Sequence, residues 1–447
     1  MLTNSQMNER EIIIRLSEKR VFALSDSKEI FPPQLFHDLS QTAQRLHQSK
    51  GDVLLICRGR YEFSVALIAS WLAGKNVILP PNLHPEMLDH IRKEHDIATE
   101  LNDGFTESDD LLLTENTQAS YEIRFNNRQQ AVTIYTSGST GKPKPIIKSI
   151  GDLFAEVFAL KNRLSWPDKP LVASVPPHHL YGLTFSILLP WVLGIAMVDK
   201  CPLHAEEVVD ALNRAEAGTL ITVPVHLRSL LEQKISCGPV IVISSAGTLE
   251  RSIAEQWFET TGRQIVEIYG SSETGIIAHR KQLNENLWTP FPEVQISSNN
   301  QDLLRVSSPF INSSEENPFQ TQDMVSMKGT SGFLLQGRVD SIVKIAGKRV
   351  SLLAVEEAIK GCRGVLDAAV TAVPVQGHIR DMAIWAAVAT DDQSSTNARS
   401  LRTQLIPLLD GIEIPRRIVM LSKLPRTDNG KLRRQDMMAL FQQNVQT

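Results

Sequence analysis

The chain has 447 residues, of which 42% are hydrophobic and 21% are charged. This is ordinary globular composition, which excludes a long disordered protein, and the length predicts two or three domains rather than one small binding module. With 46 Lys and Arg against 50 Asp and Glu, the formal net charge is −4. No overall positive field therefore exists to hold nucleic acid, and we expect no nucleic-acid partner.

Cysteine spacing and the apolar runs indicate a cytoplasmic protein without a membrane partner. The N-terminus lacks the basic start and apolar block of a signal peptide. The longest apolar run, Phe185 to Val198, is interrupted by Pro190 and is too short to span a bilayer. No CxxC or Cys/His cluster is present, so we expect reduced thiols rather than a zinc site. The four cysteines are Cys57, Cys201, Cys237 and Cys362.

Short β-branched runs alternate with longer stretches of helical period from Asp52 onward, a pattern typical of parallel strands joined by crossover helices. The fold class predicted is therefore α/β. We predict strands at 52–57, 76–80, 131–135, 171–175, 219–223, 240–244 and 264–269. We predict helices at 62–73, 205–215 and 250–261.

Beyond Trp288 several prolines separate short strands, which predicts an antiparallel section that closes a large N-terminal domain with parallel sheets. The last part of the chain then predicts a small C-terminal α+β domain. Its expected elements are strands at 342–345, 366–373 and 383–389, and helices at 352–360 and from Ala398. The boundary chosen is the tetrapeptide Gly337–Asp340, which gives domains 1–338 and 341–447.

The segment Tyr135–Pro145, YTSGSTGKPKP, follows a predicted strand directly. Its glycines let backbone N–H groups converge on an anion, its hydroxyl groups add donors, and its lysines add charge. The segment is not a Walker A motif, because too few residues separate Gly138 from Gly141 and Pro143 stands where a magnesium-binding hydroxyl is needed. A Ser/Gly-rich surface turn is the plain alternative. The run of small, hydroxylated and basic residues favours a polyphosphate cradle.

With this loop the sequence resembles the adenylate-forming superfamily of acyl-CoA synthetases, peptide-synthetase adenylation domains and luciferases. Four further stretches match that superfamily in the same order. They are Tyr269–Gly275 (YGSSETG) for its YGxTE element, Thr321–Asp323 (TQD) for TGD, Gly337–Asp340 (GRVD) with Lys344, Gly347 and Glu356 for the hinge block, and Pro425–Lys431 (PRTDNGK) for PxTxxGK.

The resemblance implies that the chain binds ATP and Mg²⁺ and converts a carboxylic acid to an acyl-adenylate with release of pyrophosphate. Glu273 would be the magnesium carboxylate, and Ser272 retains the hydroxyl of the family's threonine. Lys431 would be the catalytic lysine that pairs with the substrate carboxylate and the α-phosphate. The nucleotide would be held by Thr136, Ser137, Gly138, Ser139, Thr140, Gly141, Lys142, Gly247, Tyr269, Gly270, Asp323 and Arg338.

The resemblance also implies a C-terminal lid domain that moves about a hinge at residues 339–340. When it swings about Asp340, Lys431 would leave the site and the loop around Gly347 would line a tunnel for a phosphopantetheine thiol. The acceptor favoured is an acyl carrier protein, as for short stand-alone ligases that load aryl acids in aryl-polyene pigment clusters. An acyl- or aryl-CoA synthetase that uses free coenzyme A is the alternative.

The acid is expected to be aromatic or acyl. The segment PPHHLYGL resembles the family's PLFHxxG element, and no aspartate follows it to bind the α-ammonium of an amino acid. A packed core is the alternative for its apolar side chains. A non-catalytic nucleotide-binding homologue would require the loss of Glu273, Asp323 or Lys431, and all three are present. The predicted acid pocket is lined by His179, Tyr181, Leu183, Ala246 and Ile276.

Overall fold

The chain folds into two compact units, one of residues 1–296 with 305–319 and the other of residues 297–304 with 320–447. The computed structural model describes residues 6–8, 10–25, 28–106, 121–136, 144–233, 238, 240–284, 286–329, 331–339, 342–345, 348–374, 382–390, 396–426 and 434–443. The predicted hinge residue Asp340 lies outside these ranges, and the boundary at 338–341 stays a prediction.

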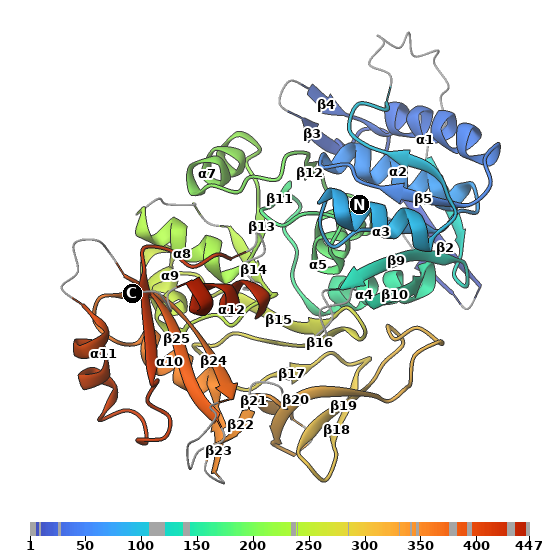
Figure 1. Cartoon of the computed structure of the whole chain (residues 1–447). Helices are drawn as coiled ribbons and strands as arrows, with labels where there is room; N and C mark the ends of the chain where they lie inside the picture. The colour runs from blue at the N-terminus through green and yellow to red at the C-terminus, as the bar shows by residue number, and fades with distance from the viewer. Residues whose placement is uncertain are drawn as a thin grey trace. The chain divides into compact units, whose positions relative to one another are not determined.

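The largest sheet of the first unit has nine strands in the order β17-β16-β15-β14-β13-β11-β12-β3-β4 (Figure 1). Its strands from β15 to β3 run parallel, whereas β16, β17 and β4 are antiparallel edges. β11 and β13 are buried along their whole length, as expected for parallel strands covered on both faces. The bounds are β3 Ala23–Ser25, β4 Lys28–Ile30, β11 Leu171–Ala173, β12 Met197–Val198, β13 Thr219–Thr222, β14 Ile241–Ser244, β15 Val266–Ser271, β16 Gly275–Arg280 and β17 Thr289–Pro290.

Two smaller sheets belong to the same unit. A five-stranded sheet has the order β10-β9-β6-β5-β7, parallel except for the β9-β10 hairpin. A three-stranded antiparallel sheet has the order β1-β2-β8. The bounds are β1 Gln6–Met7, β2 Glu11–Leu16, β5 Asp52–Leu55, β6 Val77–Leu79, β7 Ile97–Leu101, β8 Tyr121–Asn126, β9 Gln130–Thr136 and β10 Lys144–Ser149.

Helices separate and cover these sheets. Helix α4 contacts both β9 and β16, so it lies between the five-stranded and the nine-stranded sheet. Its N-terminus is closed by a capping box of Ser149 and Asp152. The bounds are α1 Pro32–His47, α2 Arg60–Leu72, α3 Pro85–Glu94, α4 Ile150–Arg163, α5 Leu180–Gly182, η1 Leu183–Leu188, α6 Leu189–Leu193, α7 Ala205–Arg214, α8 Pro224–Glu232 and α9 Arg251–Thr261. Among the described residues, no helix is both long and apolar enough to cross a membrane.

A four-stranded sheet follows in the chain, in the order β18-β19-β20-β21. Strands β20 and β21 pair in antiparallel register, which sets Asp323 opposite Arg338. The bounds are β18 Gln295–Ser298, β19 Leu303–Ser307, β20 Phe319–Met327 and β21 Phe333–Arg338. The antiparallel section predicted beyond Trp288 is therefore present.

The C-terminal part of the second unit combines a hairpin of β22 and β23 with a three-stranded sheet in the order β24-β25-β26. Helices α10 and α11 bury Val355, Ile359, Leu401 and Leu405 against the apolar side chains of β25. The bounds are β22 Ile342–Ile345, β23 Lys348–Ser351, α10 Leu352–Lys360, β24 Val365–Pro374, β25 Met382–Thr390, α11 Ala398–Leu405, β26 Arg417–Leu421 and α12 Arg434–Gln443.

The predicted fold class is confirmed: the first unit is α/β with parallel sheets, and a smaller α+β part follows. All seven strands and the three helices predicted in the first unit are present within a few residues. The elements before Asp52 were not predicted. Cys57, Cys201 and Cys362 are free thiols, as expected, while Cys237 lies outside the described residues.

Candidate functional site

The predicted phosphate loop joins the two strands of the β9-β10 hairpin. Strand β9 ends at Thr136, which is the register partner of Lys144 at the start of β10. Tyr135, at the end of β9, is buried and lies with its hydroxyl oxygen 2.7 Å from His95 Nε2. The loop residues themselves, Ser137, Gly138, Ser139, Thr140, Gly141 and Lys142, lie outside the described residues.

The next candidates lie where the parallel strands β14 and β15 end. The carboxyl ends of neighbouring parallel strands lie at the same end of a sheet, and open α/β sheets bind their ligands there. The hydroxyl group of Ser245 donates to the carbonyl oxygen of Ile268 at 2.8 Å and joins the two strand ends. Ala246 has a φ of 67°, a left-handed conformation that costs free energy for a residue with a side chain. Ala246, Gly247 and Tyr269 therefore lie at the same end of the sheet.

Tyr269 is half-buried and packs its ring against Trp288, with the ring centroids 5.4 Å apart. Arg280 lies over the other aromatic partner in this stack, 4.4 Å from the centroid of Trp288. The tryptophan was not predicted as a site residue, because an isolated aromatic residue in sequence does not reveal its partner. This stack holds the ring of Tyr269, the residue that the sequence predicts to pack on adenine.

A tight turn between β15 and β16 carries Ser272 and Glu273. Its ends are held by the hydroxyl oxygens of Ser271 and Thr274, which lie 3.0 Å apart. The backbone N–H of Thr274 also donates to Ser271 Oγ at 3.2 Å. A side chain at Gly270 would overlap the carbonyl group of Gly275, so the hairpin requires glycine at that position. These contacts fix the backbone that presents Glu273, which is partly exposed.

Lys148, which was not predicted as a site residue, anchors the turn that carries Glu273. Its ammonium group is buried, with the residue 1% exposed, and donates to the carbonyl oxygens of Glu273 at 2.8 Å and Phe310 at 2.7 Å. Lys148 belongs to β10, the strand that leaves the phosphate loop. It therefore links the strand after the predicted phosphate loop to the backbone of the predicted magnesium carboxylate.

Glu156 on α4 is the acidic counterpart of Lys148. It is 3% exposed, and its carboxylate lies beside Gly275, where a Cβ atom would be 2.9 Å from Glu156 Oε2. Burial raises the pKa of Glu156 to about 7, and the charge of Lys148 opposes that rise. Burial likewise lowers the pKa of Lys148, against the charge of Glu156. Two buried groups of opposite charge thus support the Glu273 turn.

The predicted acid pocket lies beside β13 and β14. The hydroxyl group of Tyr181 donates to the carbonyl oxygens of Thr222 and Ile243, each at 3.0 Å, and burial raises its pKa well above the usual value. Only the ring of Tyr181 is therefore available to a substrate. Leu183 and Ile276 are 0% and 3% exposed, so they are packed in the protein interior. His179 precedes α5 and packs against His178, with ring centroids 4.4 Å apart.

A polar chain that was not predicted runs next to Tyr181. His226 Nδ1 lies 2.8 Å from Ser174 Oγ, which lies 2.8 Å from Thr222 Oγ1. Ser174 follows β11, Thr222 ends β13 and His226 lies in the first turn of α8. All three therefore lie at the carboxyl ends of the parallel strands. The sequence holds no motif around His226 that would single it out from the other histidines.

Asp323 and Arg338 lie close together in the second unit. They face each other across β20 and β21, with Arg338 Nη1 3.8 Å from Asp323 Oδ1. The side chain of Asp323 is 15% exposed and that of Arg338 is 50% exposed. A carboxylate held in this way keeps oxygen atoms for the two hydroxyl groups of a ribose.

The remaining predictions lie outside the described residues: Lys431, Asp340 and Gly347. Among the described residues there is no group of three or more His, Cys, Asp or Glu side chains that would form a metal site. A single carboxylate such as Glu273 nevertheless fits Mg²⁺ that arrives with a nucleotide, because that ion takes most of its other ligands from phosphate and water.

The geometry of these strand ends agrees with what sequence comparison finds. Residues 33–297, well over half of the chain, match the family described as AMP-binding enzyme. The chain belongs to the AMP-binding enzyme family. It is an ATP-dependent, AMP-forming ligase. The alternative of a non-catalytic nucleotide-binding homologue is therefore rejected.

Curated relatives of this AMP-binding enzyme include ligases for quite different acids. The mitochondrial malonate–CoA ligase ACSF3 of Bos taurus is 22% identical, over 86% of this chain and 80% of its own length. The 4-coumarate–CoA ligase of Halorhodospira halophila is 27% identical, over 67% of this chain and 74% of its own length. The family is therefore clear, while the acid differs between relatives.

Solved structures of similar fold cover almost the whole chain. ATP-bound MatB from Rhodopseudomonas palustris has a TM-score of 0.78 at 17% identity and covers 99% of this chain and 98% of its own. The o-succinylbenzoate CoA synthetase MenE from Bacillus subtilis, in complex with its acyl-adenylate intermediate, has a TM-score of 0.77 at 18% identity and covers 94% and 95%. These likenesses establish the fold, with its large N-terminal and smaller C-terminal parts.

Proposed function

We propose that this AMP-forming ligase activates an aromatic or acyl carboxylic acid and passes the acyl group to a phosphopantetheine thiol. A carboxylate oxygen of the acid attacks the α-phosphorus of ATP, the bond to the bridging oxygen breaks, and pyrophosphate leaves. The thiol sulfur then attacks the carbonyl carbon of the acyl-adenylate, and AMP leaves. The observation that supports this proposal most is the turn that carries Glu273, which Lys148 anchors. This turn follows Tyr269 at the carboxyl end of β15, in a chain that belongs to the AMP-binding enzyme family.

In the first half of the reaction, the hydroxyl and N–H groups of residues 136–142 hold the β- and γ-phosphates. Glu273 binds Mg²⁺, which neutralises phosphate charge, and Ser272 lies next to it in the same turn. Tyr269 and Gly247 hold the adenine, and Asp323 accepts hydrogen bonds from the ribose with Arg338 beside it. Lys431 pairs with the carboxylate and the α-phosphate as negative charge develops.

In the second half, the small domain moves about Asp340, Lys431 leaves, and the loop around Gly347 lines the thiol tunnel. His179 and Tyr181 border the acyl group, with Leu183, Ala246 and Ile276 as the further walls. The buried apolar side chains around Tyr181 support an aromatic or acyl group, and the absence of an aspartate after PPHHLYG disfavours an amino acid.

The acceptor that we propose first is an acyl carrier protein, as in the stand-alone aryl acid ligases that the motifs resemble. Free coenzyme A is the second candidate. It is favoured by a specific observation, since the malonate and 4-coumarate relatives are both named as CoA ligases. Both acceptors present the same thiol, so the adenylation half of the proposal does not depend on the choice.

Pyrophosphate exchange with a panel of acids tests the proposal. The panel holds malonate, 4-coumarate, substituted benzoates, medium-chain fatty acids and amino acids, each with ATP and Mg²⁺. We expect exchange with an aromatic or acyl member and none with amino acids. Glu273→Gln should reduce exchange by about 10²-fold or more, because it removes a charge that stabilises the transition state. The matched control, Glu259→Gln at an exposed position of α9, should leave exchange unchanged.

Mass spectrometry with the active acid then identifies the acceptor, by comparing coenzyme A with a phosphopantetheinylated carrier protein. Exchange that is strongest with amino acids, or full activity of Glu273→Gln, contradicts the proposal. Thioester on coenzyme A alone overturns the carrier-protein choice but leaves the adenylation mechanism in place.

A further inference from the structure

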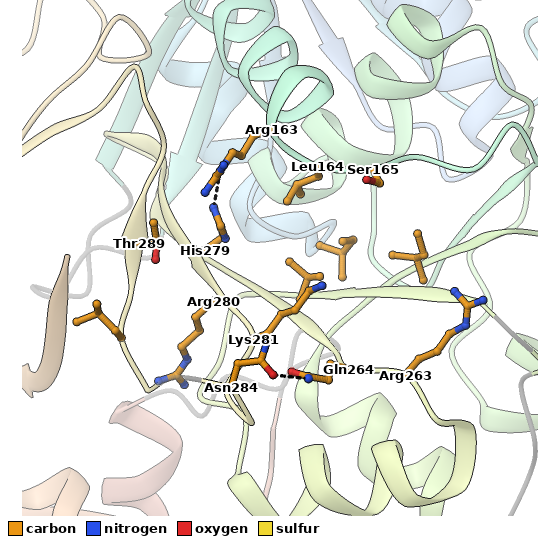
Figure 2. A pocket seen from close by; sticks show the side chains of 14 residues that line it. Arg163, Leu164, Ser165, Arg263, Gln264, His279, Arg280, Lys281, Asn284 and Thr289 are labelled. Atoms are coloured by element: carbon orange, nitrogen blue, oxygen red, sulfur yellow. Dashed lines mark hydrogen bonds between the residues drawn. The ribbon is translucent and has the colours of Figure 1, made fainter. Parts of the chain in front are cut away.

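A pocket of about 540 Å³ lies in the first unit (Figure 2). It is lined by residues at the end of α4, before and within β15, at the start of β14 and at the end of β16. It therefore opens at the amino ends of the parallel strands. Val266 and Tyr269 are three residues apart in β15, so their side chains point to opposite faces of the sheet. The pocket therefore differs from the candidate nucleotide site, although Arg280, which lies over Trp288, borders both.

The pocket is rich in cations and poor in acids. Among the residues that the structure describes, its charged lining residues are Arg163, Arg263, Arg280 and Lys281, and none is an aspartate or glutamate. Arg280 is already neutralised, because its guanidinium forms two hydrogen bonds with Glu267 at 2.8 and 3.0 Å. Within the described part of the chain, the other three cations form no ion pair with a carboxylate. Glu285, which follows Asn284 in sequence, lies outside the described residues.

A neutral histidine orients one of these cations. Arg163 Nε donates to His279 Nε2 at 2.9 Å, so that ring nitrogen is an acceptor and the imidazole carries no charge. In Figure 2 Arg163 reaches down from α4 onto His279, Lys281 lies below them near the middle of the view, and Arg263 lies at the right. The terminal nitrogens of Arg163 make no hydrogen bond to any described residue. They are the pair of donors that binds a phosphate in bidentate fashion.

The rest of the lining suits an organic molecule rather than a bare ion. Apolar side chains form much of it, from Leu164, Ile241, Ile243, Val266 and Leu287. The side-chain oxygen of Gln264 is buried and has no hydrogen-bond partner among the described residues, so it offers an acceptor to a ligand N–H or O–H group. The volume falls within the usual range of small-molecule sites.

We propose that this pocket binds a small organic phosphate, with its phosphate groups on Arg163, Arg263 and Lys281 and its ring or chain on the apolar side. The ligand has two sources with the same chemistry: a free nucleotide or phosphometabolite, or the phosphorylated adenosine end of coenzyme A. Binding itself does not depend on the proposed ligase reaction.

Isothermal titration calorimetry of the full chain with adenosine 3′,5′-bisphosphate tests the proposal at physiological ionic strength. We expect saturable binding that weakens about tenfold or more in the double variant Arg163→Gln, Lys281→Gln, because charged hydrogen bonds are lost. Arg214→Gln is the matched control, since this arginine is exposed on α7 and pairs with Asp210. The far-UV circular dichroism spectrum, measured in parallel, should be the same for all variants and reports correct folding.

Absence of bisphosphate binding, or binding that the double variant does not weaken, overturns the proposal. Displacement by ATP with no effect of the pocket substitutions assigns the bisphosphate to the nucleotide site and overturns it as well. The source follows from a second measurement, which rests on the proposed function. If the KM for coenzyme A rises about tenfold in the double variant while acid-dependent pyrophosphate exchange is unchanged, the ligand is the coenzyme; if the KM is unchanged, it is a free phosphate compound.

Discussion

At the scale of single residues, the buried pair of Lys148 and Glu156 supports the turn that carries Glu273. Lys148→Met keeps the length of the side chain but leaves Glu156 buried without a positive partner. It also leaves the carbonyl oxygens of Glu273 and Phe310 without their donor, and each buried group left unpaired costs about 1–3 kcal/mol of unfolding free energy. We expect the double variant Lys148→Met, Glu156→Gln to recover part of that loss, which denaturant unfolding of the two single variants and the double variant measures.

The same variants also show whether Lys148 positions Glu273 or only stabilises the fold. If Lys148 positions Glu273, the Lys148→Met enzyme requires a higher Mg²⁺ concentration for half-maximal pyrophosphate exchange at a temperature where it is fully folded. Lys169→Met, at an exposed position, is the control. The role proposed for Lys148 would be wrong if two results were found together. The losses in unfolding free energy of the two single variants would add up to that of the double variant, and Lys148→Met would leave the Mg²⁺ requirement unchanged.

His279 gives a prediction about pH. Desolvation lowers its pKa to about 4, and the charges of Arg163 and Lys281 act in the same direction. The folded protein thus holds a neutral imidazole, whereas the unfolded chain takes up a proton near pH 6.5. The stability that His279 contributes is fully present above that pH and is lost as the pH falls toward 4.

We therefore expect the wild-type protein to lose more stability than His279→Gln when the pH is lowered from about 7.5 to about 5. Urea unfolding at the two pH values measures this difference. The comparison with the variant is necessary because Glu156, whose pKa is raised to about 7, shifts stability in the opposite sense in both proteins. Equal losses in the two proteins would contradict the depressed pKa.

Residues such as Lys148 show where sequence reasoning stops. In KPKPIIK the lysine resembles its neighbours in a basic loop. Only the alternation of β10, which turns Ile146 and Lys148 to the same buried side, marks it as an inward cation. Its acceptors, the carbonyl groups of Glu273 and Phe310, are far away in sequence and follow from tertiary structure alone.

At the scale of elements, the β15-β16 hairpin depends on a glycine. Gly275 has a φ of 70°, and a Cβ there would lie 2.9 Å from Glu156 Oε2 and 3.0 Å from Phe310 Cβ. Gly275→Ala therefore combines a left-handed backbone with a steric overlap. We expect it to cost more than the 1–2 kcal/mol or so of the backbone conformation alone.

Gly262→Ala is the matched control for that hairpin. Gly262 ends α9 with a φ of 69°, nearly the same as Gly275, but a Cβ at Gly262 has no heavy atom within 4 Å. Thermal or urea unfolding should show a smaller loss for Gly262→Ala, and only Gly275→Ala should lower pyrophosphate exchange. Equal losses in stability would mean that the packing against Glu156 is easily relieved.

Elements with several alternating or continuous apolar residues could be predicted from sequence, as the seven strands of the first unit show. Strands β1, β3 and β4 could not, because two or three residues are too few to establish a period. Helix α1 did carry a signal, since Pro32 and Pro33 stand at its first turn. Because Asp323 and Arg338 belong to two motifs that are both expected to hold the nucleotide, their proximity could be predicted. Their register across β20 and β21 could not be predicted.

For the whole molecule, five short motifs predicted the family although relatives share only 22–27% of their residues. Residues that meet phosphate, ribose and magnesium are fixed by that chemistry, whereas core residues exchange with others of similar volume. The cationic pocket at the opposite edge of the nine-stranded sheet was not predicted. Its arginines and lysine come from separate segments and carry no motif.

Lys431 provides a test of the proposed alternation of the two domains. If Lys431 serves adenylation alone and is removed for thiol transfer, Lys431→Ala should lower adenylate formation by about 10²–10³-fold, because it removes a preorganised charge. The same variant, supplied with the synthetic acyl-adenylate and the thiol acceptor, should form thioester at close to the wild-type rate. Lys423→Ala, an exposed lysine nearby in sequence, controls for general loss of charge. Because one fixed site would use the same lysine in both steps, an equal loss in the two half-reactions would show that the domains do not alternate.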